Sequence, residues 1–437
     1  MCDLKYNYME SGLTMADFIP ELLTLKEIIF EKKSFTDAYF RARVNEKLST
    51  EGSKVLKERV LGVLRHYQCL SFESLNILPQ YSRGSDELLL NAITLYVLRF
   101  EKGHLPNDIS ALYHDTFLRM RFIGDARENF RVMEEASHEA FKIPEECKSA
   151  PTIYNSLLLE TPEFLLKRFS SEYGGEKALK LALSLHGRVA NYFLCKNTEE
   201  EKTINDDRFL NIPLSNDIIL YKAVKSVTPS QAKEASLYPV SYLDVLAMSK
   251  IDIPSITPSI LINGCYDGSC FLPFAFKTKP YYQSKIVPVF SDPIFYRLSM
   301  DLKKKYALDH VSPLLSESHL IKTYIGYDEF DIVVSYGKDS KVGLARKKPE
   351  ILPSLNEKSF SALGKNELNE LVDSSLFVKK DGVLLFICNA LDKEEGVSVV
   401  KKFLASNKNF SLVSQSYVFP SESESEGGYY AIMRKEK

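Results

Sequence analysis

Residues 330–351 read FDIVVSYGKDSKVGLARKKPEI and hold the pattern that decides the fold. The apolar, β-branched run at residues 332–334 is typical of a strand buried on both faces of a parallel sheet. A polar loop with two glycines, residues 337–343, follows, and Pro349 prevents a helix from starting earlier. Because ligands of open α/β sheets bind beyond the carboxyl ends of the strands, this loop is a candidate substrate site. A solvated surface turn is the alternative.

The composition is that of a soluble globular protein, with 437 residues, 45% hydrophobic and 26% charged. The formal net charge of −2 excludes an overall basic field, so any nucleic-acid binding must come from local patches. The 7 cysteines are scattered and lack the spacing of a zinc site, which indicates free thiols in a reducing compartment. We therefore expect a cytoplasmic monomer with no membrane segment and no metal ion.

The hydrophobic pattern changes along the chain and divides it into four parts. Residues 1–33 read as a helical leader in which Asp17 caps a helix. Residues 34–147 have helical spacing throughout and predict an all-α bundle. Residues 152–250 form an α+β connecting region, and in residues 251–437 strands alternate with helices. The predicted fold is multidomain: a helical bundle followed by an α/β, Rossmann-like domain with a mostly parallel sheet.

Further strands of the α/β domain also end in polar residues. The strand candidate at residues 259–262 (SILI) leads into a loop, residues 263–270, and the run 286–289 ends near Asp292. Since Asp292 precedes a proline, it is expected to cap the next helix. A third apolar run, residues 383–387, follows a predicted turn. These ends should meet at one edge of the sheet.

The opening stretch resembles a segment of the Sun/NOP family of RNA cytosine-5 methyltransferases, F-D-x-x-L-x-D-x-P-C-S-x-x-G-x-x-R-[RK]-x-P-[DE]. The family's aspartate falls on Tyr336, its proline on Lys338 and its cysteine on Asp339. The framework is therefore kept while the reactive residues are replaced. The framework positions are Phe330, Asp331, Ser340, Gly343, Arg346, Lys347, Pro349 and Glu350.

The loop after the first strand is similar to the family's S-adenosylmethionine loop, D-x-C-A-A-P-G-G-K-T. Its two glycines fall on Gly268 and Ser269, and its lysine on Cys270. An ordinary strand-to-helix turn is the alternative. The resemblance implies S-adenosylmethionine as cofactor, held by Asp267, Gly268, Ser269, Asp292 and Tyr336.

The run GVLLFICNALDKEEG at residues 382–396 resembles the family's G-x-L-V-Y-x-T-C-S-x-x-x-x-E-N. The family's cysteine nucleophile falls on Asn389, and Cys388 lies one residue earlier. Because side chains alternate along a strand, Cys388 should point to the opposite face. The catalytic candidates are Cys388, as a surrogate nucleophile, with Asn389 and Asp339. A buried, unreactive thiol is the alternative for Cys388.

The helical part resembles the NusB-like RNA-binding domain of bacterial Sun proteins, through the signature at residues 62–65 (GVLR). Gly62 inside a helix costs about 1 kcal/mol relative to alanine, which close helix packing would explain. The resemblance implies structured RNA, ribosomal RNA in particular, as partner. The RNA-binding candidates are Arg346, Lys347, Lys348, Lys341 and Arg65.

The closing residues, 426–434, resemble the family's last strand, which inserts antiparallel into the sheet. The acidic run before it, SESESEGG at residues 421–428, predicts a mobile loop. The sequence thus predicts an RNA-binding member of an S-adenosylmethionine-dependent RNA cytosine-5 methyltransferase family. The alternative is a catalytically inactive pseudo-methyltransferase that acts as an RNA-binding or ribosome-assembly factor.

Overall fold

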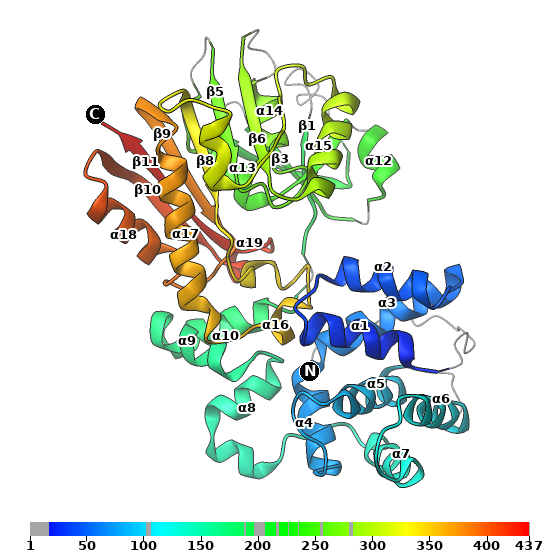
Figure 1. Ribbon diagram of the computed structural model, residues 1–437. Coiled ribbons are helices and arrows are strands. Elements are labelled where there is room, and N and C mark those ends of the chain that lie inside the picture. The colour runs from blue at the N-terminus through cyan, green and yellow to red at the C-terminus, as the bar shows by residue number, and fades with distance from the viewer. Residues whose placement is uncertain are drawn as a thin grey trace. The chain divides into compact units, whose positions relative to one another are not determined.

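The computed structural model describes residues 17–101, 106–187, 189–195, 206–215, 218–225, 227–234, 236–253, 257–278 and 283–436. The chain divides into two compact units (Figure 1). A helical unit comprises Met1–His186 together with Lys348–Leu355, and an α/β unit comprises Gly187–Lys347 together with Asn356–Lys437. Among the described residues, no helix is both long and apolar enough to cross a membrane.

The helical unit is built around α5 (Asp86–Phe100), which α1, α3, α4, α6 and α7 all contact. Its residues 88–95 are buried on every side, as expected for a central helix that is apolar all round. Ser85 caps it, its Oγ accepting a hydrogen bond of 3.2 Å from the Leu88 N–H. The other helices are α1 (Ile19–Ile29), α2 (Phe35–Asn45), α3 (Thr50–Arg65), α4 (Tyr67–Ile77), α6 (Pro106–Arg119), α7 (Ala126–Ser137), the 3₁₀ helix η1 (Glu145–Ser149), α8 (Pro151–Leu158), α9 (Glu163–Tyr173), α10 (Gly175–Ser184) and α16 (Ile351–Ser354).

Gly62 lies where α3 packs against α5. A Cβ at this position would overlap the ring of Tyr96 on α5. The close packing expected from a glycine inside this helix is confirmed.

The α/β unit begins with a small antiparallel sheet in the order β2-β3-β1-β4. The connecting region of the sequence is thus shared between the units, since α8 to α10 count with the helical unit. The elements are β1 (Tyr192–Cys195), β2 (Phe209–Ser215), β3 (Ile218–Ala223), α12 (Pro229–Glu234), β4 (Leu237–Val240) and α13 (Tyr242–Ser249).

The larger sheet of the α/β unit has seven described strands in the order β10-β11-β9-β8-β5-β6-β7. Neighbours from β9 to β7 are parallel, whereas β11 lies antiparallel between β9 and β10. The mostly parallel sheet and its antiparallel last strand are both confirmed. Its strands are β5 (Ser259–Asn263), β6 (Lys285–Phe290), β7 (Leu314–Leu315), β8 (Phe330–Tyr336), β9 (Val378–Cys388), β10 (Phe410–Val418) and β11 (Gly428–Lys435).

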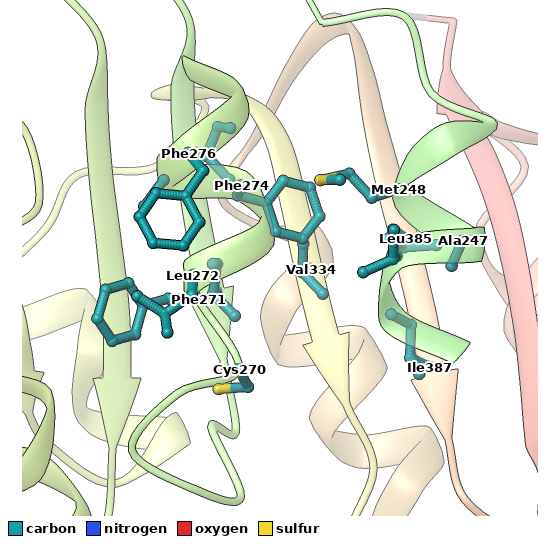
Figure 2. Packing of buried hydrophobic residues seen from close by; sticks show 14 of the residues in the cluster. Ala247, Met248, Cys270, Phe271, Leu272, Phe274, Phe276, Val334, Leu385 and Ile387 are labelled. Atoms are coloured by element: carbon teal, nitrogen blue, oxygen red, sulfur yellow. The ribbon is translucent and has the colours of Figure 1, made fainter. Parts of the chain in front are cut away.

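Helices cover both faces of this sheet. Successive side chains of its central strands point to opposite faces, and so both sets are buried. Ile260 and Ile262 join a core with α13 and α14, whereas Leu261 joins a core with α17 and α18. Figure 2 shows Phe274 of α14 over Val334 of β8. The remaining elements are α14 (Leu272–Thr278), α15 (Pro293–Tyr306), η2 (Ser318–Thr323), η3 (Val342–Leu344), α17 (Ser359–Ser375), α18 (Val397–Ser406) and α19 (Pro420–Ser423).

Two local predictions are wrong. Residues 380–382 are not a turn before a strand but lie inside β9, where Asp381 has φ +61°. The pairing with β8 jumps there from Val378 to Val383, so a bulge absorbs the turn-forming residues. The acidic run at residues 421–428 is not a mobile loop. Its Glu426 is fully buried and accepts a hydrogen bond of 2.7 Å from the Tyr242 N–H.

Candidate functional site

A cavity of about 410 Å³ lies beyond the carboxyl ends of β5, β6 and β8. Its volume is in the range of small-molecule and cofactor sites, roughly 300–1,000 Å³. The position is the one that an open α/β sheet offers to a ligand. The cavity is lined by Asn263, Gly264, Cys265, Tyr266, Val289, Ser291, Asp292, Phe295, Ser316, Ser318, Gly337, Lys338, Asp339, Lys341 and Leu363.

The first half of the loop after β5 supplies the wall next to that strand. Gly264 has φ +75°, and a Cβ there would approach the carbonyl oxygen of Tyr336 to 2.5 Å. Only glycine fits this left-handed, tightly packed position. Asn263 is held on both sides of its amide: its Nδ2 donates to Ser374 Oγ at 2.8 Å, and its Oδ1 accepts from Ser318 Oγ at 3.0 Å. The wall is therefore preorganised.

The predicted cofactor residues are not gathered at one place. Asp292 lines the cavity, and its Oδ1 caps α15 by accepting from the Ile294 N–H at 2.7 Å. The cap expected from the sequence is confirmed. Asp267 accepts from the Ser269 N–H at 2.6 Å, so this part of the loop folds back on itself. Gly268 packs against Leu298, which a Cβ would meet at 2.6 Å.

Below the cavity lies a buried aromatic and acidic group. Tyr266 lines the cavity, and its hydroxyl donates to Asp244 Oδ2 at 2.8 Å. Burial raises the pKa of Asp244 to about 8, against the opposing effect of this hydrogen bond. Tyr336 is buried beside them, with its ring edge-on to Tyr266 at a centroid distance of 5.0 Å. Tyr336, a cofactor candidate from the sequence resemblance, is thus part of the packing beneath the site.

Asp339 and Asn389, both catalytic candidates from the sequence resemblance, are brought together. The Asp339 carboxylate accepts from the Asn389 N–H and, at 2.7 Å, from the Lys341 N–H. Burial raises the pKa of Asp339 to about 6, and these hydrogen bonds lower it less. The Asn389 side chain donates to the Gly427 carbonyl at 3.4 Å. Of the two, Asp339 lines the cavity.

Cys388 is buried at the end of β9, with 1% of its surface exposed. It packs in the core under α17 and α18, whereas Ile387 packs in the core on the other face, so the expected alternation holds. Its Sγ donates to the Glu395 carbonyl at 3.6 Å. Burial, followed by the nearby Glu367 and Asp339 carboxylates, holds the pKa of this thiol well above its usual range. A thiol in these surroundings is a poor nucleophile.

The basic candidates differ in what they contact. Arg346 is half-buried and donates to the Pro420 carbonyl at 3.0 Å, and the Lys347 ammonium lies 2.7 Å from the buried Glu426 carboxylate. Lys341 is exposed at the rim of the cavity. Lys348 and Arg65 are exposed residues of the helical unit.

Glu367 on α17 is a site residue that sequence reasoning missed. It is buried, and its carboxylate lies against Gly337 of the cavity wall. A signal was present, because Glu367 stands four residues before the buried Leu371 and seven before the buried Ser374. This spacing puts a carboxylate on the inward face of an amphipathic helix.

Solved structures show which fold this is. No protein-family model and no curated protein matches the sequence. The structure of PH0851 superposes with a TM-score of 0.72 at 16% identity, covering 96% of this chain and 98% of that one. A methyltransferase homolog protein from Pyrococcus horikoshii matches with a TM-score of 0.53 at 14% identity, over 65% of this chain and 99% of that one.

NSun6 from Pyrococcus horikoshii, solved with SFG, matches with a TM-score of 0.52 at 13% identity, over 63% of this chain and 98% of that one. At such identities the likeness concerns the fold alone. The chain therefore has an N-terminal helical region, α1 to α10, followed by a Rossmann-like α/β domain of the methyltransferase type.

Proposed function

We propose that this protein binds S-adenosylmethionine in the cavity at the carboxyl edge of the sheet and acts on structured RNA. The observation that carries the proposal is the cavity itself, which lies at the ends of β5, β6 and β8 in a methyltransferase-type fold. Likeness in fold to NSun6 and to a methyltransferase homolog supports the assignment. The RNA substrate class comes from the resemblance to Sun/NOP enzymes.

The residues present fit such a cofactor. Asp292 at the end of β6 offers a carboxylate to the ribose hydroxyls, and the rings of Tyr266 and Phe295 offer apolar surface to the adenine. S-adenosylmethionine, when bound, supplies an electrophilic methyl group. The chain holds the cofactor between the loop after β5 and the first turn of α15. In this assignment Asp267, Gly268 and Ser269 shape the loop from behind.

Cytosine-5 chemistry through a cysteine adduct is not what these residues support. That reaction needs a thiolate nucleophile, which a carboxylate or an amide cannot replace. The resemblance puts the two family cysteines on Asp339 and Asn389, and Cys388 is buried. We therefore propose either methyl transfer to an RNA atom that needs no covalent adduct or, as the alternative, a catalytically inactive RNA-binding role.

Lys341 is the basic residue best placed for RNA, since it is exposed and lines the mouth of the cavity. Replacing Lys341 by Ala should weaken RNA binding. It should also reduce the slope of log K against log salt concentration by about 1, the effect of one lost phosphate contact. Lys401→Ala, an exposed lysine of α18, is the matched control. Equal salt dependence in both variants would remove Lys341 from the RNA site.

The two candidate roles are separated by incubating the protein with RNA and methyl-labelled S-adenosylmethionine. Label in RNA that persists in Cys388→Ala supports methyl transfer without an adduct. RNA binding without any labelled RNA supports the inactive role. Label that disappears in a folded Cys388→Ala but persists in wild-type protein stripped of metal would contradict both.

A further inference from the structure

Three ligand-type side chains from three separate elements converge behind the cavity wall. Asp339 follows β8, Glu367 lies on α17 and Cys388 ends β9. One carboxylate oxygen of each acid and the sulfur of Cys388 all lie within 4.8 Å of one another. This group, the Asp339–Glu367–Cys388 cluster, is distinct from the residues assigned above to the cofactor.

The Glu367 side chain provides a second observation, which indicates that the cluster lacks a ligand. It is 0% exposed, and neither of its carboxylate oxygens has a hydrogen-bond partner among the described residues. A buried carboxylate left without any donor bears the full desolvation penalty of the group. Such a group is stabilised either by a bound cation or by taking up a proton.

Among the described residues no lysine, arginine or histidine forms an ion pair with Glu367, so a bound cation is the partner that the cluster lacks. The ammonium of Lys338 points elsewhere, 3.6 Å from Glu370 and 3.9 Å from Glu317. The cluster is therefore a buried group of three ligand-type side chains with no cationic side chain to neutralise Glu367.

We propose that Asp339, Glu367 and Cys388 form a Zn²⁺ site at the carboxyl ends of β8 and β9. A sulfur ligand favours zinc over the hard cations Mg²⁺ and Ca²⁺, and cysteine and carboxylate ligands both belong to the zinc repertoire. Cys388 gives up its thiol proton to solvent when it becomes a ligand, as metal-binding cysteines do. The sequence conceals the site because its ligands are 28 and 21 residues apart (367 − 339 and 388 − 367).

The three ligand atoms, now within 4.8 Å of one another, need to move only slightly closer to bind one zinc ion. With Zn–S about 2.3 Å and Zn–O about 2.1 Å, ligand atoms of a tetrahedral site stand roughly 3.3–3.6 Å apart. Three protein ligands leave one position open. Asp339 and the neighbouring Gly337 line the cavity, so the open position lies toward the cavity and is available to water or to an oxygen of a bound molecule.

The test is zinc binding by the full-length chain. The protein is stripped with a chelator, and Zn²⁺ is added in competition with a chromophoric chelator. We expect one zinc per chain, and we expect Cys388→Ala and Glu367→Gln each to weaken binding at least about 100-fold, more than loss of an outer-sphere contact does. Co²⁺ in place of zinc should show thiolate-to-metal charge-transfer absorption that Cys388→Ala abolishes.

Two matched controls test whether the site is the one proposed. Cys270→Ala removes another buried cysteine of the α/β unit, and Glu370→Gln changes a carboxylate three residues along α17; both should bind zinc as the wild type does. Near-ultraviolet circular dichroism checks the fold of every variant, with Cys388→Ser as a second variant if the alanine does not fold. Absence of zinc and of the cobalt–thiolate absorption in the wild type would overturn the proposal. Undiminished binding by a folded Cys388 variant would do the same.

Discussion

Asp339 accepts a hydrogen bond from the backbone N–H of Asn389, and so joins the segment after β8 to the end of β9. In the resemblance to Sun/NOP methyltransferases, the family's two cysteines fall on Asp339 and Asn389. The pair links the ends of the two strands, because the Asn389 carbonyl also accepts from the Gly343 N–H at 2.7 Å. Both residues therefore have a structural role at the carboxyl edge of the sheet.

The first prediction concerns covalent capture of RNA. RNA containing 5-fluorocytosine traps enzymes that attack cytosine through a thiolate, because the adduct cannot be resolved after methyl transfer. We predict no adduct on denaturing gels with the wild type, since Cys388 is buried and its thiol pKa is raised. An adduct that Cys388→Ala eliminates would show that this cysteine reaches the base.

A second prediction concerns Lys347 and Glu426. Glu426 is 1% exposed and Lys347 is 36% exposed, so removing the ammonium leaves a buried carboxylate without its cation. Lys347→Ala should lower the free energy of unfolding by about 1–3 kcal/mol, below the cost for a fully buried pair because water reaches the lysine. Urea denaturation measures this, with the exposed Lys408→Ala as control. Adding Glu426→Gln should restore part of the loss; a double variant no more stable than Lys347→Ala would argue against the pair.

The third prediction is a pH dependence of stability caused by Asp244. Its pKa is raised to about 8 by burial, so the folded chain keeps a proton that the unfolded chain loses near its ordinary value of 3.8. Stability from this group is complete below about pH 4 and is lost as the pH rises toward 8, by up to about 1.4 kcal/mol per pH unit.

Asp244→Asn removes that titration. The difference in unfolding free energy between this variant and the wild type should therefore grow in favour of the variant from pH 5 to pH 8. Urea denaturation at four pH values measures it, and Asp301→Asn, at an exposed position of α15, should show no such trend. Parallel curves for Asp244→Asn and wild type would contradict the burial of an uncharged carboxyl.

The fourth prediction is that Gly62→Ala destabilises the helical unit. Alanine gains about 1 kcal/mol in helix propensity, but its methyl group would overlap the Tyr96 ring, which already packs on Phe100 at 5.2 Å. Overpacking of this kind costs about 1–3 kcal/mol, so the net change should be a loss. Gly175→Ala in α10, where a Cβ meets nothing within 4 Å, should be neutral or stabilising. A stabilised Gly62→Ala would mean that the ring moves aside freely.

The parallel sheet could be predicted because its signal is local and strong. Runs such as residues 260–262 and 332–334 are apolar on both faces, as expected for a strand that is covered by helices on both sides. The helix cap at Asp292 could also be predicted, because Asp followed by Pro is typical of a helix N-terminus. The turn expected at residues 380–382 became a bulge because pairing with β8 outweighed the local turn preference.

The candidate site was predicted only in part, because its members are assembled by tertiary packing. Asp292, Asp339 and Lys341 lie at strand and loop ends and line the cavity, as the sequence predicts. Asp267 and Gly268 were assigned to the cofactor from a loop motif. In the structure Asp267 bonds within its own loop and Gly268 packs against Leu298. Glu367 was missed because a glutamate in an amphipathic helix is ordinarily solvated. Its spacing from Leu371 puts it on the inward face of α17, and the packing of α17 on β8 and β9 buries it.

Titration calorimetry measures whether the cavity binds S-adenosylmethionine, since the chain has no Trp to report binding by fluorescence. We predict micromolar affinity, about −8 kcal/mol, in the wild type. We predict loss of binding in Ser291→Trp, which fills the cavity from an exposed position, and retention in Ser416→Trp on the edge strand β10. No heat of binding in the wild type, with or without RNA, would contradict the proposed cofactor binding.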